Sequence, residues 1–197
     1  MKQRAFIRYF DMENRARVSF QVEGGKIRRF VVQYETFKDA AWRPIIRYDT
    51  AHGFAHADLF HPKGKPTKIP LPEVDFNEAL TLAQEDINRN WERIFNAVPR
   101  GEKSVKRVSK TFYKNLMIGA EFDKYLIEHP RFAESIPDGA LVVLLPQDDA
   151  ALCRENLRIA KARAEEGQPV VYVTIKKLAP APRSRIIAPQ IEYAKTG

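Results

Sequence analysis

The 197-residue chain contains one cysteine, Cys153. A single cysteine cannot form an intrachain disulfide, and it excludes the zinc sites that are built from pairs of cysteines. Sparse cysteine also favours a reducing compartment. No apolar run reaches the ~18–20 residues needed to cross a bilayer, and the N-terminal residues MKQRAFIRYF lack the apolar core of a secretory signal. These absences predict a cytoplasmic protein without a membrane partner.

The sequence also lacks the short motifs of several large enzyme classes. It contains no GxSxG elbow, no Walker loop and no GxGxxG fingerprint. The predicted strand-to-helix turn at 145–149 reads Leu-Pro-Gln-Asp-Asp. Acidic side chains at a helix N-terminus satisfy the helix dipole themselves and repel phosphate. We therefore expect no nucleotide site there, no cofactor and no bound metal.

Positive charge is in excess, with a formal net charge of +8. A basic surface favours polyanions such as RNA or DNA. Basic residues concentrate between Arg100 and Lys114 and again between Lys176 and Arg185. The alternative is that both stretches are simply solvated. The candidate nucleic-acid contacts are Lys103, Lys106, Arg107, Lys110, Lys176, Lys177, Arg183 and Arg185.

The N-terminal half alternates apolar and polar residues in short runs, which predicts an antiparallel β-meander. The expected strands are 4–10, 15–22, 26–36, 42–48 and 54–61. Gly24-Gly25 marks a hairpin turn between the second and third. Four prolines in 62–74 exclude a central strand or a helix from that segment. A long helix follows, because Asp75 and Glu78 form a capping box and apolar residues then recur at helical spacing.

The C-terminal half predicts a small α-β-α-β module. A helix is expected over 109–128 because Pro130 ends it. The continuous apolar runs at 141–145 and 170–175 are typical of buried strands, and a helix capped by Asp148 separates them. The fold class is therefore α+β, with a meander packed by one long helix over 1–98 and the second module over 109–197. We expect limited proteolysis to cut first in the basic segment 99–108 or in 62–74.

The densest group of polar residues runs from Arg47 to His61 and holds three of the four histidines. On strands, the period of two puts Arg47 and Asp49 on one face, and likewise His56 and Asp58. If the two strands pair across the His52-Gly53 turn, these four side chains converge, and His52 can swing into the same place.

That set of residues suits metal-independent RNA cleavage. His56 would be the general acid or base, with His52 in reserve. Arg47 would bind the phosphate, and Asp58 or Asp49 would orient the imidazole. One alternative is a metal site of His52 and His56 with Asp58 or His61, although strand alternation separates His56 from His61. The other is a polar turn with solvated histidines.

Two stretches also resemble known families. The residues Arg47-Tyr48-Asp49-Thr50-Ala51-His52-Gly53, the downstream histidines and the helix from Phe76 resemble the TumE-like toxins of prokaryotic toxin–antitoxin pairs. Those toxins show a strand ending in an Arg-Tyr-Asp-type turn, a histidine-bearing strand and a helix of similar phase. The resemblance covers about residues 25–97, and the proline-rich insert at 62–74 departs from it. Residues 109–182, with EHPRFAESIPDGALVVLLPQDD and GQPVVYVTIKKLAP, are similar to a small prokaryotic family of unassigned function.

The resemblance implies a toxin–antitoxin-related protein that acts on or binds RNA through its N-terminal module, with the C-terminal module modulating it. The expected partner is RNA or another nucleic acid, together with a protein partner in some settings. Two alternatives stay open: a non-catalytic interaction or assembly protein, and a metal-dependent hydrolase.

Overall fold

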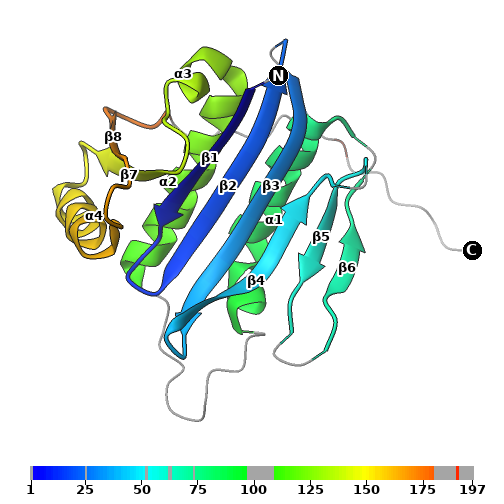
Figure 1. Ribbon diagram of the computed structural model, residues 1–197, viewed down its shortest axis with the longest axis horizontal. Helices are drawn as coiled ribbons and strands as arrows, with labels where there is room; N and C mark the ends of the chain where they lie inside the picture. Colours follow the sequence, from blue (N-terminus) through cyan, green and yellow to red (C-terminus); the bar gives the residue numbers. More distant parts are fainter. Residues whose placement is uncertain are drawn as a thin grey trace, which may run out of the picture.

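The computed structural model describes residues 2–24, 26–51, 53–61, 64–72, 74–96, 109–179 and 190. Within these residues a single eight-stranded sheet has the order β6-β5-β4-β3-β2-β1-β7-β8 (Figure 1). The strands are β1 (Lys2–Tyr9), β2 (Asn14–Glu23), β3 (Lys26–Lys38), β4 (Ala41–Asp49), β5 (His56–Leu59), β6 (Thr67–Pro70), β7 (Ala140–Pro146) and β8 (Val170–Ile175). The helices are α1 (Phe76–Asn96), α2 (Lys110–Glu128), α3 (Pro130–Glu134) and α4 (Ala150–Arg163). The α+β prediction is confirmed.

The N-terminal meander follows the predicted pattern. Strands β1 to β5 pair antiparallel with their sequence neighbours, and Gly24 takes a left-handed φ of 57° in the β2–β3 turn. The proline-rich segment contributes β6, which lies at the edge of the sheet. An edge position suits Pro70, because proline has no amide hydrogen to donate to a neighbouring strand. No central strand comes from this segment, as predicted.

The two faces of the meander differ sharply. Ala16 and Val18 of β2 are buried, whereas Arg17 between them is exposed. In Figure 1, α1 and α2 lie behind the strands of the meander, and alternation along β2 puts Arg17 on the face away from these helices. We call the uncovered face of β2 to β6 the open face. Alternation along each strand therefore assigns every side chain of the meander either to the core or to the open face.

The C-terminal part extends the same sheet. Strand β7 pairs parallel with β1, through Phe6↔Ala140 and Ile7↔Leu141, and β8 pairs parallel with β7. The two predicted strands on either side of a helix are thus confirmed and they pair in parallel, but β8 is an edge strand with Tyr172 exposed and is not fully buried. Pairing with β7 also covers the side of β1 that would otherwise be an unpaired edge.

The predicted long helix packs on the meander, and α2 of the C-terminal half packs on the same face of the sheet beside it. Helix α1 lies against β3 and β4, and α2 packs beside it over β1. The Phe112 ring lies 5.4 Å from that of Phe10, and the Phe122 ring lies 6.2 Å from that of Phe6. Phe6 and Phe10 are buried only because α2 covers them. The core therefore contains side chains from both halves of the chain.

The structure confirms one of the two N-caps predicted from the sequence and adds a third at Ser109. Asp75 accepts a hydrogen bond from the Glu78 amide, and Ser109 accepts one from the Phe112 amide. The N-cap of α4 is Asp149 rather than Asp148, because Asp149 Oδ1 accepts the Leu152 amide at 3.0 Å. Either aspartate fits the sequence pattern of an N-cap. The cap is the one whose side chain accepts a hydrogen bond from the backbone amide three residues later.

A buried ion pair fastens β1 to α2. Arg8 Nη2 lies 2.5 Å from Asp123 Oδ2, and both side chains are almost fully buried. The guanidinium crosses α2 at Gly119, where an added Cβ would lie 1.8 Å from Arg8 Nη1. Glycine is required here by the close approach rather than by its backbone angles.

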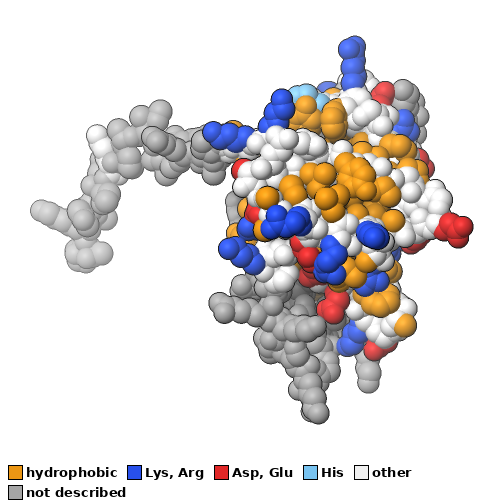
Figure 2. Space-filling view, turned by 90° about the vertical axis from the view of Figure 1, so that its left-hand side faces the viewer, with side chains coloured by type: hydrophobic (Ala, Val, Ile, Leu, Met, Phe, Trp, Pro, Cys, Tyr) orange, Lys and Arg blue, Asp and Glu red, His pale blue; other side chains and the backbone are white. Residues whose placement is uncertain are grey.

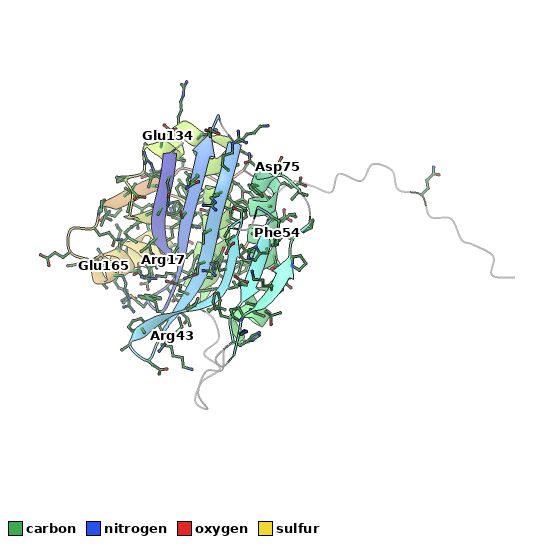
Figure 3. All side chains as sticks on the ribbon, turned by 45° about the vertical axis from the view of Figure 1, so that its right-hand side comes forward. Arg17, Arg43, Phe54, Asp75, Glu134 and Glu165 are labelled. Carbon is green, nitrogen blue, oxygen red and sulfur yellow. The ribbon has the colours of Figure 1, made fainter. Side chains whose placement is uncertain are left out.

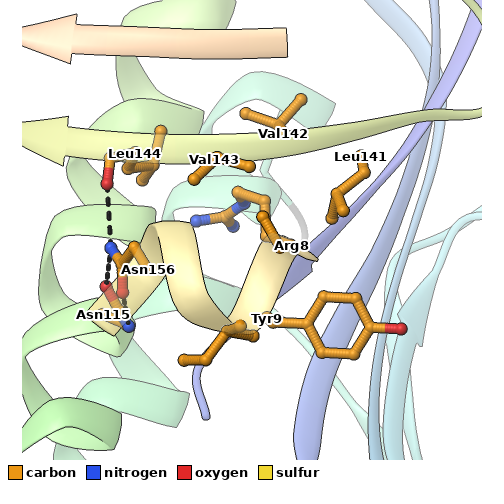
Figure 4. Close-up of a pocket in the computed structure, with 10 residues that line it drawn as sticks. Arg8, Tyr9, Asn115, Leu141, Val142, Val143, Leu144 and Asn156 are labelled. Atoms are coloured by element: carbon orange, nitrogen blue, oxygen red, sulfur yellow. Dashed lines mark hydrogen bonds between the residues drawn. The ribbon is translucent and has the colours of Figure 1, made fainter. Parts of the chain in front are cut away.

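An amide pair beside this ion pair connects α2 to α4. Asn115 and Asn156 donate to each other, and Asn156 also donates to the Leu144 carbonyl (Figure 4). Arg8 points into the space between them and β7, where a cavity of ≈ 20 Å³ is large enough for one water molecule. The junction between the two halves therefore contains buried polar groups whose partners come from both.

Strand β8 forms the other edge of the sheet. Figure 2 shows the side of the molecule that lies to the left in Figure 1, where hydrophobic side chains gather with Lys and Arg around them. Tyr125, Phe132 and Leu178 are exposed around a groove of ≈ 410 Å³ between the helices and the end of β8. Among the described helices, none combines the length and the apolar character that crossing a membrane requires.

Candidate functional site

Strand pairing brings Arg47, Asp49, His56 and Asp58 together on the open face. Arg47 lies opposite Asp58, and Asp49 lies opposite His56, in the β4–β5 ladder. The intervening residues, Tyr48 and Ala57, are buried on the covered side. We refer to the four residues as the β4–β5 cluster.

The cluster is held by contacts between oppositely charged groups. Arg47 Nε lies 3.2 Å from Asp49 Oδ2, and Arg47 Nη2 donates to Asp58 Oδ2 at 3.3 Å. His56 Nε2 lies 3.5 Å from Asp49 Oδ1 and 3.8 Å from Asp58 Oδ2. The imidazole therefore faces both carboxylates, and the guanidinium bridges them.

Burial is unequal within the cluster. The side chain of His56 is 2% exposed and those of Asp49 and Asp58 are 7% and 6% exposed, whereas that of Arg47 is 38% exposed. The Phe54 ring lies 5.3 Å from the His56 ring, and Arg47 stacks over Phe60 at 5.6 Å. Arg47 is thus the member that an incoming ligand meets first, with the imidazole and carboxylates beneath it.

Local backbone contacts fix the orientation of these groups. Asp49 Oδ1 accepts the Ala51 amide at 3.0 Å, and His56 Nδ1 lies 3.5 Å from the Phe54 carbonyl oxygen. Below the cluster, the Tyr48 hydroxyl donates to Asp86 Oδ2 at 2.6 Å and ties β4 to α1. Burial, with the adjacent Asp86 carboxylate, raises the pKa of Tyr48 well above its usual range, so this hydroxyl stays protonated.

The other predicted site residues do not join the cluster. His61 is exposed, and its Nε2 lies 2.8 Å from the Thr67 hydroxyl. Lys110 is exposed at the start of α2, and Lys176 and Lys177 follow β8 at the far edge of the sheet from β5 and β6. The remaining predictions lie outside the described residues: His52, Lys103, Lys106, Arg107, Arg183 and Arg185.

Strand register adds basic and polar residues that sequence reasoning missed. One cross-strand row runs over five strands of the open face and consists of Arg17, Gln33, Arg47, Asp58 and Lys68. Figure 3 labels Arg17 on this face and Phe54 beside the β4–β5 cluster. The sequence did contain the information needed to find them. Val18 and Phe20 are apolar and face the core, so alternation places Arg17 and Ser19 on the other face of the strand.

The centre of this face contains two shallow depressions, where short side chains such as Ala5 and Ser19 leave space. One depression of ≈ 350 Å³ is lined by Ala5, Arg17, Ser19, Val31 and Gln33, among others. A second, of ≈ 240 Å³, shares Ser19 and Val31 and reaches Arg29. The open face therefore offers a trough whose walls carry arginines and amides and which leads toward the β4–β5 cluster.

Comparison with known proteins classifies both halves. Residues 1–104 match a domain of unknown function, DUF7718, and these residues make up more than half of the chain. The chain belongs to the DUF7718 family. Residues 109–188 match a second family of unknown function, DUF5647, so the DUF7718 region is followed by a separate module. No curated protein and no solved structure matches.

The β4–β5 cluster and the open face lie wholly within the DUF7718 region. Neither family match is to TumE-like toxins, so that resemblance stays a hypothesis. The two matches meet between residues 104 and 109, close to the predicted division at 99–108.

Proposed function

We propose that the open face of the DUF7718 region binds single-stranded RNA and that Arg47 contacts a phosphate of the bound strand. The observation that carries this proposal is the cross-strand row of Arg17, Gln33, Arg47, Asp58 and Lys68 beside the hollowed centre of the face. The Arg17 side chain is 59% exposed and that of Arg47 is 38% exposed, so both guanidiniums are accessible to a phosphate. Guanidinium groups are the preferred partners of phosphate oxygens.

An uncovered sheet suits a single strand better than a duplex. Single-stranded RNA lays its bases against exposed sheet faces and stacks them on aromatic side chains. Trp42 is half-buried on the same face and contacts the rings of Tyr9 and Phe37 at 5.6 Å and 5.2 Å. These rings, with the Arg15 guanidinium 4.1 Å from the Trp42 ring centroid, form one end of a face that otherwise carries charged and polar side chains of both signs.

Burial of the imidazole favours binding over catalysis as the primary activity. A general base must come within hydrogen-bond reach of the ribose 2′-hydroxyl, and the side chain of His56 is 2% exposed. RNA cleavage by His56 therefore requires the groups around its ring to move first. The toxin–antitoxin relation, and modulation by the DUF5647 region, remain hypotheses that build on RNA binding.

Salt-dependent RNA binding tests the proposal. We expect the full chain to bind a labelled single-stranded RNA with an affinity that falls as salt rises, because each phosphate contact releases counterions. Arg17→Ala, Arg29→Ala and Arg47→Ala should each flatten the plot of log K against log salt by about 0.7 units, the single-strand value per phosphate. Fluorescence anisotropy from low to physiological salt measures both quantities.

A matched control comes from the covered side of the molecule. Arg131 is exposed on α3, which packs beside α2, so Arg131→Ala should leave the salt slope unchanged. If Arg131→Ala weakens binding as much as Arg47→Ala does, the open face has no special role. Absence of RNA affinity at low salt would refute the proposal and favour the interaction-protein alternative.

A further inference from the structure

We propose that Asp49, His56 and Asp58 bind a divalent cation, with Zn²⁺ as the best fit. Each residue offers one ligand atom, and these atoms all lie within 4.8 Å of one another on two paired strands. The set differs from the one considered from the sequence, since Asp49 takes the place of His52 and His61 is not included. It supplies one nitrogen and two oxygens, which are ligand types that Zn²⁺ accepts.

Distances within the cluster fit an ion better than direct hydrogen bonds. His56 Nε2 is 3.5 Å from Asp49 Oδ1 and 3.8 Å from Asp58 Oδ2, beyond the usual hydrogen-bond range of about 2.7–3.2 Å. Ligand atoms held ~2.1 Å from a tetrahedral ion lie ~3.4 Å apart. The imidazole nitrogen thus lies from each carboxylate at about the separation that a shared ion imposes, and all three ligand atoms lie within 4.8 Å of one another.

Charge balance points the same way. The two aspartates bring two carboxylates to a site that is more than nine-tenths buried except at Arg47, and Arg47 is the one permanently positive side chain in contact with them. Burying an uncompensated charge is costly. Asp58 Oδ1 is also buried without a hydrogen-bond partner among the described residues. A cation beside Asp58 supplies both the missing charge and the missing partner.

The imidazole is oriented as a ligand would be. The Phe54 carbonyl oxygen lies 3.5 Å from His56 Nδ1, longer than a usual hydrogen bond but on the side of the ring away from the carboxylates. Metal-bound histidines typically donate one ring N–H to such an acceptor, which directs the lone pair of the other nitrogen at the ion. Here that nitrogen is Nε2, the atom that faces both aspartates.

Arg47 and the ion compete for the same carboxylates. Arg47 contacts Asp49 Oδ2 and Asp58 Oδ2, so an ion that neutralises the aspartates weakens its hold on the guanidinium. A released Arg47 is available to a phosphate. This release of Arg47 predicts that Zn²⁺ strengthens RNA binding. Only this prediction rests on the proposed function, because the metal site itself does not require RNA.

Calorimetric titration of Zn²⁺ into the chelator-treated full chain tests the site without RNA. We expect one ion per chain. Asp58→Asn and His56→Gln should weaken binding at least about tenfold, because each removes a ligand. Arg47→Ala should strengthen binding, because it removes the competitor and keeps all three ligands. Tighter binding of one ion by a variant whose circular dichroism spectrum matches wild type does not come from misfolding, so this variant keeps the test decisive if the others are unstable.

Two control variants address Zn²⁺ binding elsewhere. His61→Ala and Asp39→Asn remove an exposed histidine and an exposed carboxylate outside the cluster and should leave the affinity unchanged. Absence of Zn²⁺ binding, or equal affinities for wild type, Asp58→Asn and Arg47→Ala, would overturn the inference and indicate a metal-free ionic network. Because the titration contains no RNA, its failure is distinct from failure of the RNA assay.

Discussion

Replacing Asp123 by Ala is expected to destabilise the full chain by about 3–5 kcal/mol, because it leaves the Arg8 guanidinium buried without its counter-charge. The side chains of Arg8 and Asp123 are 4% and 2% exposed, so water cannot take over the lost contact. The total stability of a typical domain is only about 5–15 kcal/mol. Urea unfolding followed by circular dichroism measures the difference between variant and wild type.

Three further variants show whether the loss of stability comes from the broken ion pair or from a general change in packing. Glu155→Ala breaks the exposed Arg158–Glu155 pair on α4 and should cost under about 1 kcal/mol. The double variant Arg8→Met/Asp123→Leu should recover most of the stability, because apolar residues can replace a buried pair. Gly119→Ala should destabilise strongly, since its Cβ would meet the Arg8 guanidinium. If Asp123→Ala is no worse than Glu155→Ala, the buried pair is not holding β1 to α2.

The fragment 1–104, which spans the whole DUF7718 match, is expected not to fold cooperatively on its own. Without α2, the Phe6 and Phe10 side chains, each 1% exposed in the full chain, lose their aromatic neighbours Phe122 and Phe112. Burial of each such side chain is worth about 1.5–3 kcal/mol. Loss of β7 also leaves β1 as an open edge. Thermal unfolding and size-exclusion chromatography of the fragment test this.

The contrasting experiment cuts the chain after it has folded. A protease site inserted in 99–108 should allow cleavage while the two pieces co-elute, because the shared sheet and the Arg8–Asp123 pair hold them together. A fragment 1–104 with a sharp unfolding transition would instead show that the DUF7718 region is an autonomous domain.

Most elements of the fold were predictable from local patterns. Alternating residues such as Val18 and Phe20 identified the β2 strand, and Ser109 and Pro130 marked the two ends of α2. The pairing of β1 with β7 was not predictable, because these strands are more than 130 residues apart and no local pattern records which edge accepts a parallel neighbour. Arg8 illustrates the same limit, since a charged residue in a strand is normally assigned to solvent.

The sequence predicted which residues make up the candidate site but not how far they are buried. The period of two placed Arg47 and Asp49 on one strand face, and the β4–β5 register brings His56 and Asp58 to them. Their burial could not be inferred, because it depends on the Phe54 ring lying against the imidazole and on Arg47 lying against the carboxylates.

The sequence by itself determined most of the strands and helices, the Asp75 cap of α1 and the side of β2 that faces the core. These features depend on residue periodicity and on contacts within a few positions along the chain. Only the tertiary structure decided that the two halves share one sheet, that Arg8 and Asp123 meet beneath it, and that Arg17 and Lys68 lie in the same row as Arg47. The physical reason is that these contacts depend on strand order, register and helix docking. Those are set by the total burial of the folded chain and not by any short stretch of residues.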